Sequence, residues 1–152
     1  AYAVDCRPTD HESWTIMPEV IKNEVSPVYN SNKKKGSAVF YGDKLTLLNN
    51  GTGQKLHSHD WTQSPITSQQ EVTCQTWNNM EDNWSVEHDV YNITSEEEVP
   101  WNECHNIVLM HDPYKLGLNS HHYMLNDKYQ EVTCFGNKVN TSKWRAEILY
   151  NC

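Results

Sequence analysis

The chain has 152 residues and a formal net charge of −8 at pH 7. This length is enough for one domain with its own core, and the negative charge argues against a nucleic-acid-binding protein, which normally carries a basic face. No stretch approaches the roughly 18 consecutive apolar residues of a transmembrane helix, so we expect no direct membrane insertion.

Short strands separated by turns are predicted along most of the chain. Alternating or β-branched segments, typical of strands, cover residues 44–48, 71–74, 84–87, 107–110, 131–134 and 144–148. Turn-forming sequences lie between them, at residues 49–53, 78–79, 112–113 and 136–137. The polar segments 23–37 and 94–104 are expected to be connections between units. No long segment has the period of a helix, so the sequence predicts an all-β fold.

Two stretches carry the same sequence elements in the same order: a Leu-x-Ser-His motif, a Gln-Glu-Val-Thr-Cys motif and a tryptophan. These elements are residues 56–59, 70–74 and Trp84 in one stretch, and residues 118–121, 130–134 and Trp144 in the other. Residues 3–6 followed by Trp14 repeat only the end of the pattern. Three such units predict a pseudo-threefold barrel in a single domain, residues 1–152. Its units are a partial repeat at 1–22 and full repeats at 38–92 and 105–150.

The tryptophans and cysteines of the repeats are predicted to lie in a shared core. Trp14, Trp84 and Trp144 recur at regular positions, which indicates packing. Trp77 and Trp101 fall outside the repeat pattern and are freer to make surface contacts. Cys6, Cys74 and Cys134 are equivalent, so we expect buried, reduced thiols there. Cys104 with Cys152 is then the favoured disulfide, although spacing does not determine connectivity.

Four Asn-x-Ser/Thr sequons are candidate N-glycosylation sites. They are Asn50, Asn83, Asn92 and Asn140. Each alone carries little weight in an Asn-rich chain, but together they favour an oxidising, glycosylating compartment.

The repeats resemble MIR repeats, a family named after protein O-mannosyltransferases, inositol trisphosphate receptors and ryanodine receptors. The shared pattern is Leu-His-Ser-His, a variable loop, Gln-Gln-x-Val-Thr-Cys and Asn-x-Trp-x-Val-Glu, and residues 56–87 carry all of it. The Ser-Pro-Ile-Thr stretch at 64–67 resembles the O-mannosyltransferase version. The other full copy departs from the pattern at Asn119, and the N-terminal copy keeps only its end.

This resemblance implies a β-trefoil with an incomplete first repeat, in the endoplasmic reticulum lumen or secreted. It also implies a non-catalytic binding module of a protein O-mannosylation system, with a mannose-type glycan or an acceptor polypeptide as ligand. In O-mannosyltransferases catalysis belongs to the membrane part, so a membrane-embedded mannosyltransferase is an implied partner. Relatives similar to stromal-cell-derived factor two act alone in lumenal quality control, which leaves a protein-binding adaptor as the alternative.

The Leu-x-Ser-His loops supply the candidate ligand-binding residues. Sugar recognition needs planar polar side chains for hydroxyl groups and an aromatic face for the C–H side of the ring. The candidates are His57, Ser58, His59, Trp61 and Gln70 in one repeat, and Asn119, Ser120, His121, Tyr123 and Gln130 in the other. Because His57 and His59 would share one side of a strand, a metal site is one alternative. A hydrogen-bonded turn with one packed and one solvent-facing histidine is another.

Catalytic motifs are lacking in the sequence. There is no G-x-S-x-G nucleophile motif and no glycine-rich phosphate loop. Asp82 with Glu87, or the acidic residues 96–98, could in principle act as an acid–base pair, but charged loops explain them better. We therefore expect no catalytic residue and no cofactor.

Overall fold

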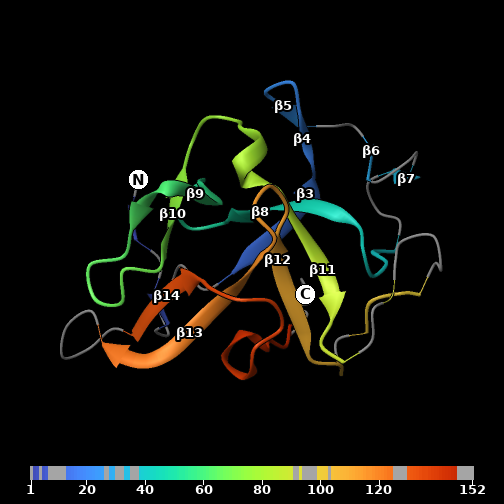
Figure 1. The fold of residues 1–152 in the computed structure, drawn as a ribbon. Helices are drawn as coiled ribbons and strands as arrows, with labels where there is room; N and C mark the ends of the chain where they lie inside the picture. The colour runs from blue at the N-terminus through green and yellow to red at the C-terminus, as the bar shows by residue number, and fades with distance from the viewer. Residues whose placement is uncertain are drawn as a thin grey trace.

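The computed structural model describes residues 2–3, 5–6, 13–25, 28–29, 33–34, 38–90, 93, 99–102, 104–124 and 130–146. Within these residues the regular structure is β-strand, apart from the short 3-10 helices η1 (Met80–Asp82) and η3 (Asn140–Ser142) (Figure 1). The predicted all-β class is confirmed. No helix in the described part of the chain is long and apolar enough to cross a membrane.

Most strands are short, and the two longest, β9 and β13, each form one arm of a hairpin. They are β1 (Tyr2–Ala3), β2 (Asp5–Cys6), β3 (Trp14–Pro18), β4 (Val20–Ile21), β5 (Glu24–Val25), β6 (Val28–Tyr29), β7 (Lys33–Lys34), β8 (Lys44–Asn49), β9 (Lys55–Gln63), β10 (Gln70–Gln75), β11 (Trp84–His88), β12 (Ile107–His111), β13 (Leu116–Met124) and β14 (Gln130–Cys134). The pairs β4–β5 and β6–β7 form separate two-stranded sheets. All the other strands belong to one antiparallel sheet.

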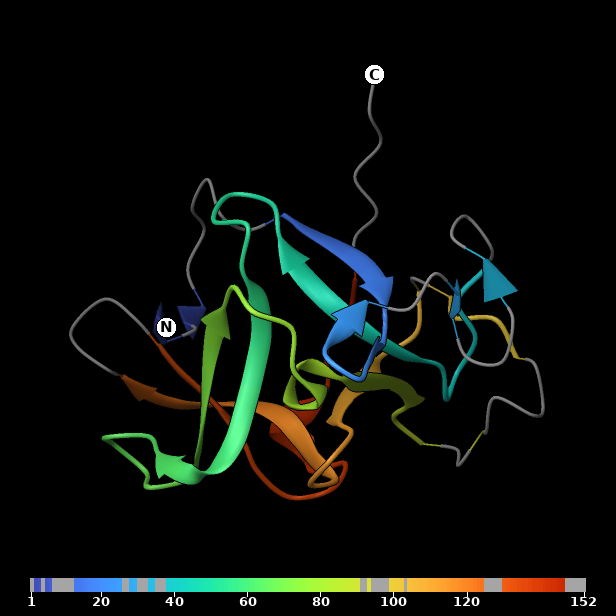
Figure 2. The same cartoon turned by 90° about the horizontal axis from the view of Figure 1, so that it is seen from above.

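Seven of these strands close into a barrel-like ring. The order around it is β8, β9, β10, β14, β13, β12 and β11, and β11 pairs back to β8. Figures 1 and 2 show this ring from two directions, with β3 lying along β8. Closure pairs the strands on both sides and so removes exposed sheet edges from the ring.

The Gln-Glu-Val-Thr-Cys strands pair with each other and with the N-terminal strands in a cycle. In each pairing, a cysteine at the end of one strand, or one residue before it, lies opposite the residue that begins another strand. The pairs are Gln70 with Cys134, Gln130 with Cys6, and Tyr2 with Cys74. β1 and β2 therefore hold the same place relative to their neighbours as β10 and β14 do.

The long hairpins β9–β10 and β13–β14 have the same internal register. Leu56 lies opposite Cys74, and Leu118 lies opposite Cys134. Each hairpin also binds an indole: Trp84 Nε1 donates to the Leu56 carbonyl at 3.1 Å, and Trp144 Nε1 donates to the Leu118 carbonyl at 2.8 Å. The two full copies of the sequence pattern thus form matching structures.

The core lies inside the ring and centres on Trp84, which is 0% exposed. Its other buried hydrophobic members are Tyr41, Leu45, Leu47, Leu56, Val72, Cys74, Val86, Ile107, Leu118, Val132 and Cys134. Trp14 and Trp144 are half-buried against it, as expected of repeat tryptophans. Trp77 is exposed, whereas Trp101 is half-buried and packs against the core.

The cysteines divide into buried and exposed thiols. Cys74 and Cys134 are buried and free, which confirms the prediction of reduced core cysteines for these two. Burial raises the pKa of Cys74 to about 11 and that of Cys134 to about 12. Cys104 is an exposed free thiol in a turn after Trp101, so the predicted bond to Cys152 is not found there. Cys152 and the Cys6 side chain lie outside the described residues.

We predict that Trp84→Phe destabilises the fold more than Trp144→Phe does. Each change removes an indole N–H bonded to a backbone carbonyl, but Trp84 is fully buried and Trp144 is not. The expected loss of unfolding free energy is about 2–3 kcal/mol for Trp84→Phe and about 1 kcal/mol for Trp144→Phe. Urea denaturation measures both, and equal losses would contradict the central place given to Trp84.

Candidate functional site

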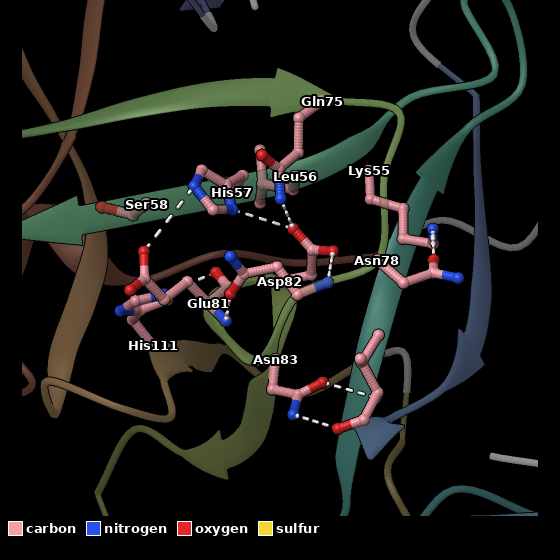
Figure 3. Close-up of polar contacts among 12 residues, drawn as sticks. Lys55, Leu56, His57, Ser58, Gln75, Asn78, Glu81, Asp82, Asn83 and His111 are labelled. Atoms are coloured by element: carbon pink, nitrogen blue, oxygen red, sulfur yellow. Dashed lines mark hydrogen bonds and ion pairs between the residues drawn. The ribbon is translucent and has the colours of Figure 1, made fainter. Parts of the chain in front are cut away.

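The first histidine of the Leu-His-Ser-His motif lies in a buried polar network (Figure 3). His57 is 3% exposed, and its Nδ1 lies 2.8 Å from Asp82 Oδ1. Gln75 Nε2 donates to the same carboxylate oxygen at 2.7 Å, and His57 Nε2 lies 3.8 Å from Glu81 Oε2. The ring of His57 is therefore buried and bound within the protein, and its assignment as a ligand-binding residue stays a prediction.

His111 belongs to the same network. Its Nε2 lies 2.8 Å from the Glu81 carbonyl oxygen, and its ring meets that of Trp84 edge-on at 4.8 Å between centroids. Burial lowers the pKa of His111 to about 4, despite the favourable contact with the Glu81 carbonyl. Among the described residues no group of three or more His, Cys, Asp or Glu side chains could hold a metal ion. The network ties β9, β10, η1 and β12 together.

The serines and glutamines of the two motifs brace their own hairpins. Gln70 Nε2 donates to Ser58 Oγ at 2.7 Å, and this hydroxyl donates to the Glu71 carbonyl at 2.7 Å. The other hairpin repeats the arrangement, with Gln130 to Ser120 at 2.8 Å and Ser120 to the Glu131 carbonyl at 2.9 Å. These four candidates thus serve the hairpins, where buried polar groups need partners.

Asn119 occupies the place of His57 and is equally buried. Thr141, from η3, donates a hydrogen bond to Asn119 Oδ1, as η1 provides Asp82 for His57. The amide of Asn119 is therefore buried and bound within the protein like the His57 ring, and its ligand-binding role also stays a prediction.

An open depression of about 400 Å³ lies where the accessible candidates of the second full repeat contact the first full repeat. It is lined by Ile66, Thr67 and Gln69 from the β9–β10 turn, and by Tyr123 from β13. Tyr123 is 48% exposed. The His121 ring lies 5.8 Å from the Tyr123 ring. We call this place, with His121, the junction depression.

Gln69 joins the two sides of the junction depression. Thr133 Oγ1 donates to Gln69 Oε1 at 2.6 Å. His121 Nε2 lies 3.1 Å from Gln69 Oε1 and 3.0 Å from Gln69 Nε2. The imidazole can donate to the amide oxygen or accept from the amide nitrogen, and its Nδ1 is then an acceptor or a donor respectively. Such a group suits a hydroxyl, which can play either role.

His59 and Trp61 form a second, separate aromatic surface. Their rings stack at 4.0 Å between centroids with an interplanar angle of 6°. Thr62 Oγ1 lies 2.9 Å from His59 Nδ1, and Trp61 is 67% exposed. They occupy positions on β9 that match His121 and Tyr123 on β13, but they do not line the junction depression.

Sequence reasoning assigned no ligand role to Ile66, Thr67 or Gln69. A signal for them existed, because Ser-Pro-Ile-Thr at 64–67 and the Gln69-Gln70 pair are part of the recognised pattern. What the sequence did not show is that this turn packs against the other repeat.

The sequons have different surroundings. Asn83 is 1% exposed (Figure 3). Its Oδ1 accepts from the Val20 N–H at 2.8 Å, and its Nδ2 donates to the Val20 carbonyl at 3.0 Å. The Asn83 amide is thus buried and engaged within the fold, and its glycosylation stays a prediction. Asn50 and Asn140 are exposed and stay predictions. Asn92 lies outside the described residues.

Solved structures resemble the chain, whereas no family model and no curated protein matches it. The SDF2-like protein of Arabidopsis thaliana has a TM-score of 0.77 and 25% identity, over 95% of this chain and 76% of that one. A Caenorhabditis elegans protein of unknown function has a TM-score of 0.73 and 23% identity, over 94% and 76%. The S. cerevisiae protein O-mannosyltransferase Pmt1-Pmt2 complex bound to the sugar donor gives 0.56 and 22%, over 79% of this chain and 20% of that one.

These neighbours agree with the resemblance seen in the sequence. The fold is similar to that of the SDF2-like protein, which is consistent with the MIR-like repeats seen in the sequence. The two likenesses below 25% identity show the fold alone.

We predict that His111 makes the fold less stable in mild acid. Its pKa is about 4 in the folded chain and 6.5 when unperturbed. Between these values the unfolded chain binds a proton that the folded chain does not, so stability falls as pH falls. From pH 7 to pH 5 the His111 contribution is about 2 kcal/mol.

The variant His111→Gln keeps a donor for the Glu81 carbonyl but does not titrate. Urea denaturation at pH 7 and pH 5 should show a smaller acid-induced loss for the variant than for the wild type. The same loss in both proteins would mean that other groups cause the acid sensitivity.

Proposed function

We propose that the chain is a non-catalytic MIR-type module that binds a glycan or an acceptor polypeptide in a protein O-mannosylation system. The observation that carries this proposal is the junction depression, where an exposed tyrosine ring lies beside an amide–imidazole pair. The pair fits hydroxyl groups, and the ring fits the C–H face of a sugar. We favour a mannose-type glycan as ligand because it presents both.

The architecture that we propose is a β-trefoil in one domain, residues 1–152, with an incomplete first repeat. The closed ring, the matching hairpins and the cyclic pairing of β1, β2, β10 and β14 support it. The repeats would be 1–22, 38–92 and 105–150. Ligand binding then falls at the contact between the two full repeats.

For location we propose the endoplasmic reticulum lumen or the outside of the cell. The exposed sequons Asn50 and Asn140 and the likeness to part of a protein O-mannosyltransferase complex support this. A membrane-embedded mannosyltransferase is the partner that fits such a module. No cofactor enters the proposal, and any transfer chemistry would belong to that partner.

The second candidate function is a stand-alone adaptor for protein quality control that binds a protein partner. The SDF2-like neighbour favours it, because the likeness covers most of both chains, whereas the chain spans only a fifth of the mannosyltransferase chain. Exposed hydrophobic side chains outside the junction depression, such as Trp77 and Met80, are suited to protein contacts.

We predict that the wild-type protein binds mannose-terminated glycans on an array. In titration calorimetry with mannotriose, Tyr123→Ala should weaken binding by about tenfold, because the ring stacking is lost. His121→Ala should weaken it similarly, through the lost hydrogen bond to a sugar hydroxyl.

The control is Trp77→Ala, which removes an exposed aromatic ring away from the junction depression. Trp61→Ala reports whether the second aromatic surface takes part. An empty array with a folded protein would favour the adaptor. Binding that Tyr123→Ala leaves unchanged would place the sugar site elsewhere.

A further inference from the structure

The turn between β9 and β10 forms one wall of the junction depression. Its own backbone closes it, with the Ser64 N–H donating to the Gln69 carbonyl at 2.8 Å and the Ser68 N–H donating to the Ser64 carbonyl at 3.0 Å. Ser68 has a φ of 60°, a left-handed conformation that a residue other than glycine adopts at a cost. Contacts from outside the turn must therefore help to fix its shape.

Those contacts come from a buried carboxylate of the other repeat. Glu131, on β14, is 1% exposed. Its Oε1 accepts from Thr67 Oγ1 at 2.6 Å, and its Oε2 accepts from the Ile66 N–H at 3.3 Å and from the Ser64 hydroxyl. All three donors belong to the turn.

A buried carboxylate is unfavourable unless donors replace its water. Here the hydroxyls and the N–H of the turn are those donors, and hydrogen bonds to a charged acceptor are stronger than neutral ones. The dependence is mutual: the turn satisfies the carboxylate, and the carboxylate selects the turn conformation that presents Ile66 and Thr67 to the depression.

The equivalent residue of the preceding copy shows that the Gln-Glu-Val-Thr-Cys motif alone does not require this contact. Glu71 occupies the same position on β10 and is half-buried. Within the described residues its carboxylate has no hydrogen-bond or ion-pair partner. Glu131 therefore accepts hydrogen bonds from a turn of the other repeat and Glu71 does not, so Glu71 is a matched control for Glu131.

We propose that Glu131 is the positioning residue of the junction depression. Its carboxylate, supplied by one repeat, holds the 64–69 turn of the other in the shape that binds ligand. The depression then has its binding shape only while Glu131 of one repeat is hydrogen-bonded to the turn of the other. We call this contact the clasp. This inference rests on the proposed function for its ligand, but the clasp itself can be tested without a ligand.

The test compares Glu131→Ala, Glu131→Gln and Glu71→Ala by amide hydrogen exchange and by mannotriose titration. In Glu131→Ala we expect exchange at Ile66–Ser68 to be at least about tenfold faster and mannotriose binding to be about tenfold weaker. In Glu131→Gln the amide oxygen can face Ser64 and Ile66 while its NH₂ donates to Thr67, so both properties should stay near the wild type. Glu71→Ala should change neither.

If Glu131→Ala does not fold, the double variant Ser64→Ala/Thr67→Val removes two of the three donors and leaves the carboxylate in place. It should show the same local effects. Unchanged exchange at Ile66–Ser68 in a folded variant of either kind would overturn the clasp. Faster exchange with unchanged mannotriose binding would overturn the role of Glu131 in ligand binding.

A wild-type protein that binds no mannotriose and no glycan on the array would contradict the proposed glycan ligand instead. The exchange comparison would still decide whether Glu131 holds the turn. The two failures are therefore distinguishable.

Discussion

The structure depends on the antiparallel pairing of β10 with β14. Each strand pairs with its own hairpin partner on one side, and this contact joins the two hairpins and closes the ring. The same pairing brings the 64–69 turn of one copy beside Glu131, Thr133 and His121 of the other. The candidate site is thus a product of ring closure, since neither hairpin contains all of its parts.

The Leu-x-Ser-His motif has two parts with different physical roles. In β9 its first three residues are buried; in β13 the first two are buried and Ser120 is half-buried. Their polar groups are hydrogen-bonded to residues of the 3-10 helices, to glutamines and to backbone carbonyls. The histidine that ends the motif and the aromatic residue two positions later reach the surface. Because a buried polar group without a partner is costly, much of the polarity of the motif belongs to the fold.

This division explains what could be predicted from the sequence. The repeat order and the alternation of residues predict the strands, the buried Trp84 and the core thiols of Cys74 and Cys134, because each depends on local pattern. The burial of His57 and Asn83 could not be read in this way. Both depend on partners distant in sequence, Asp82 and Val20, and a polar residue looks the same in a sequence whether a ligand or the protein satisfies it.

The difference between the two hairpins follows from the same logic. His59 stacks on Trp61 at the tip of one hairpin, and no turn from a neighbouring copy joins them among the described contacts. His121 and Tyr123 hold matching positions but face a turn that Glu131 anchors and that Gln69 links to His121. Near-identical motifs therefore produce the second aromatic surface in one copy and the junction depression in the other. Which of the two a repeat forms is decided by the neighbour against which its hairpin closes, and so by the order of the repeats around the ring.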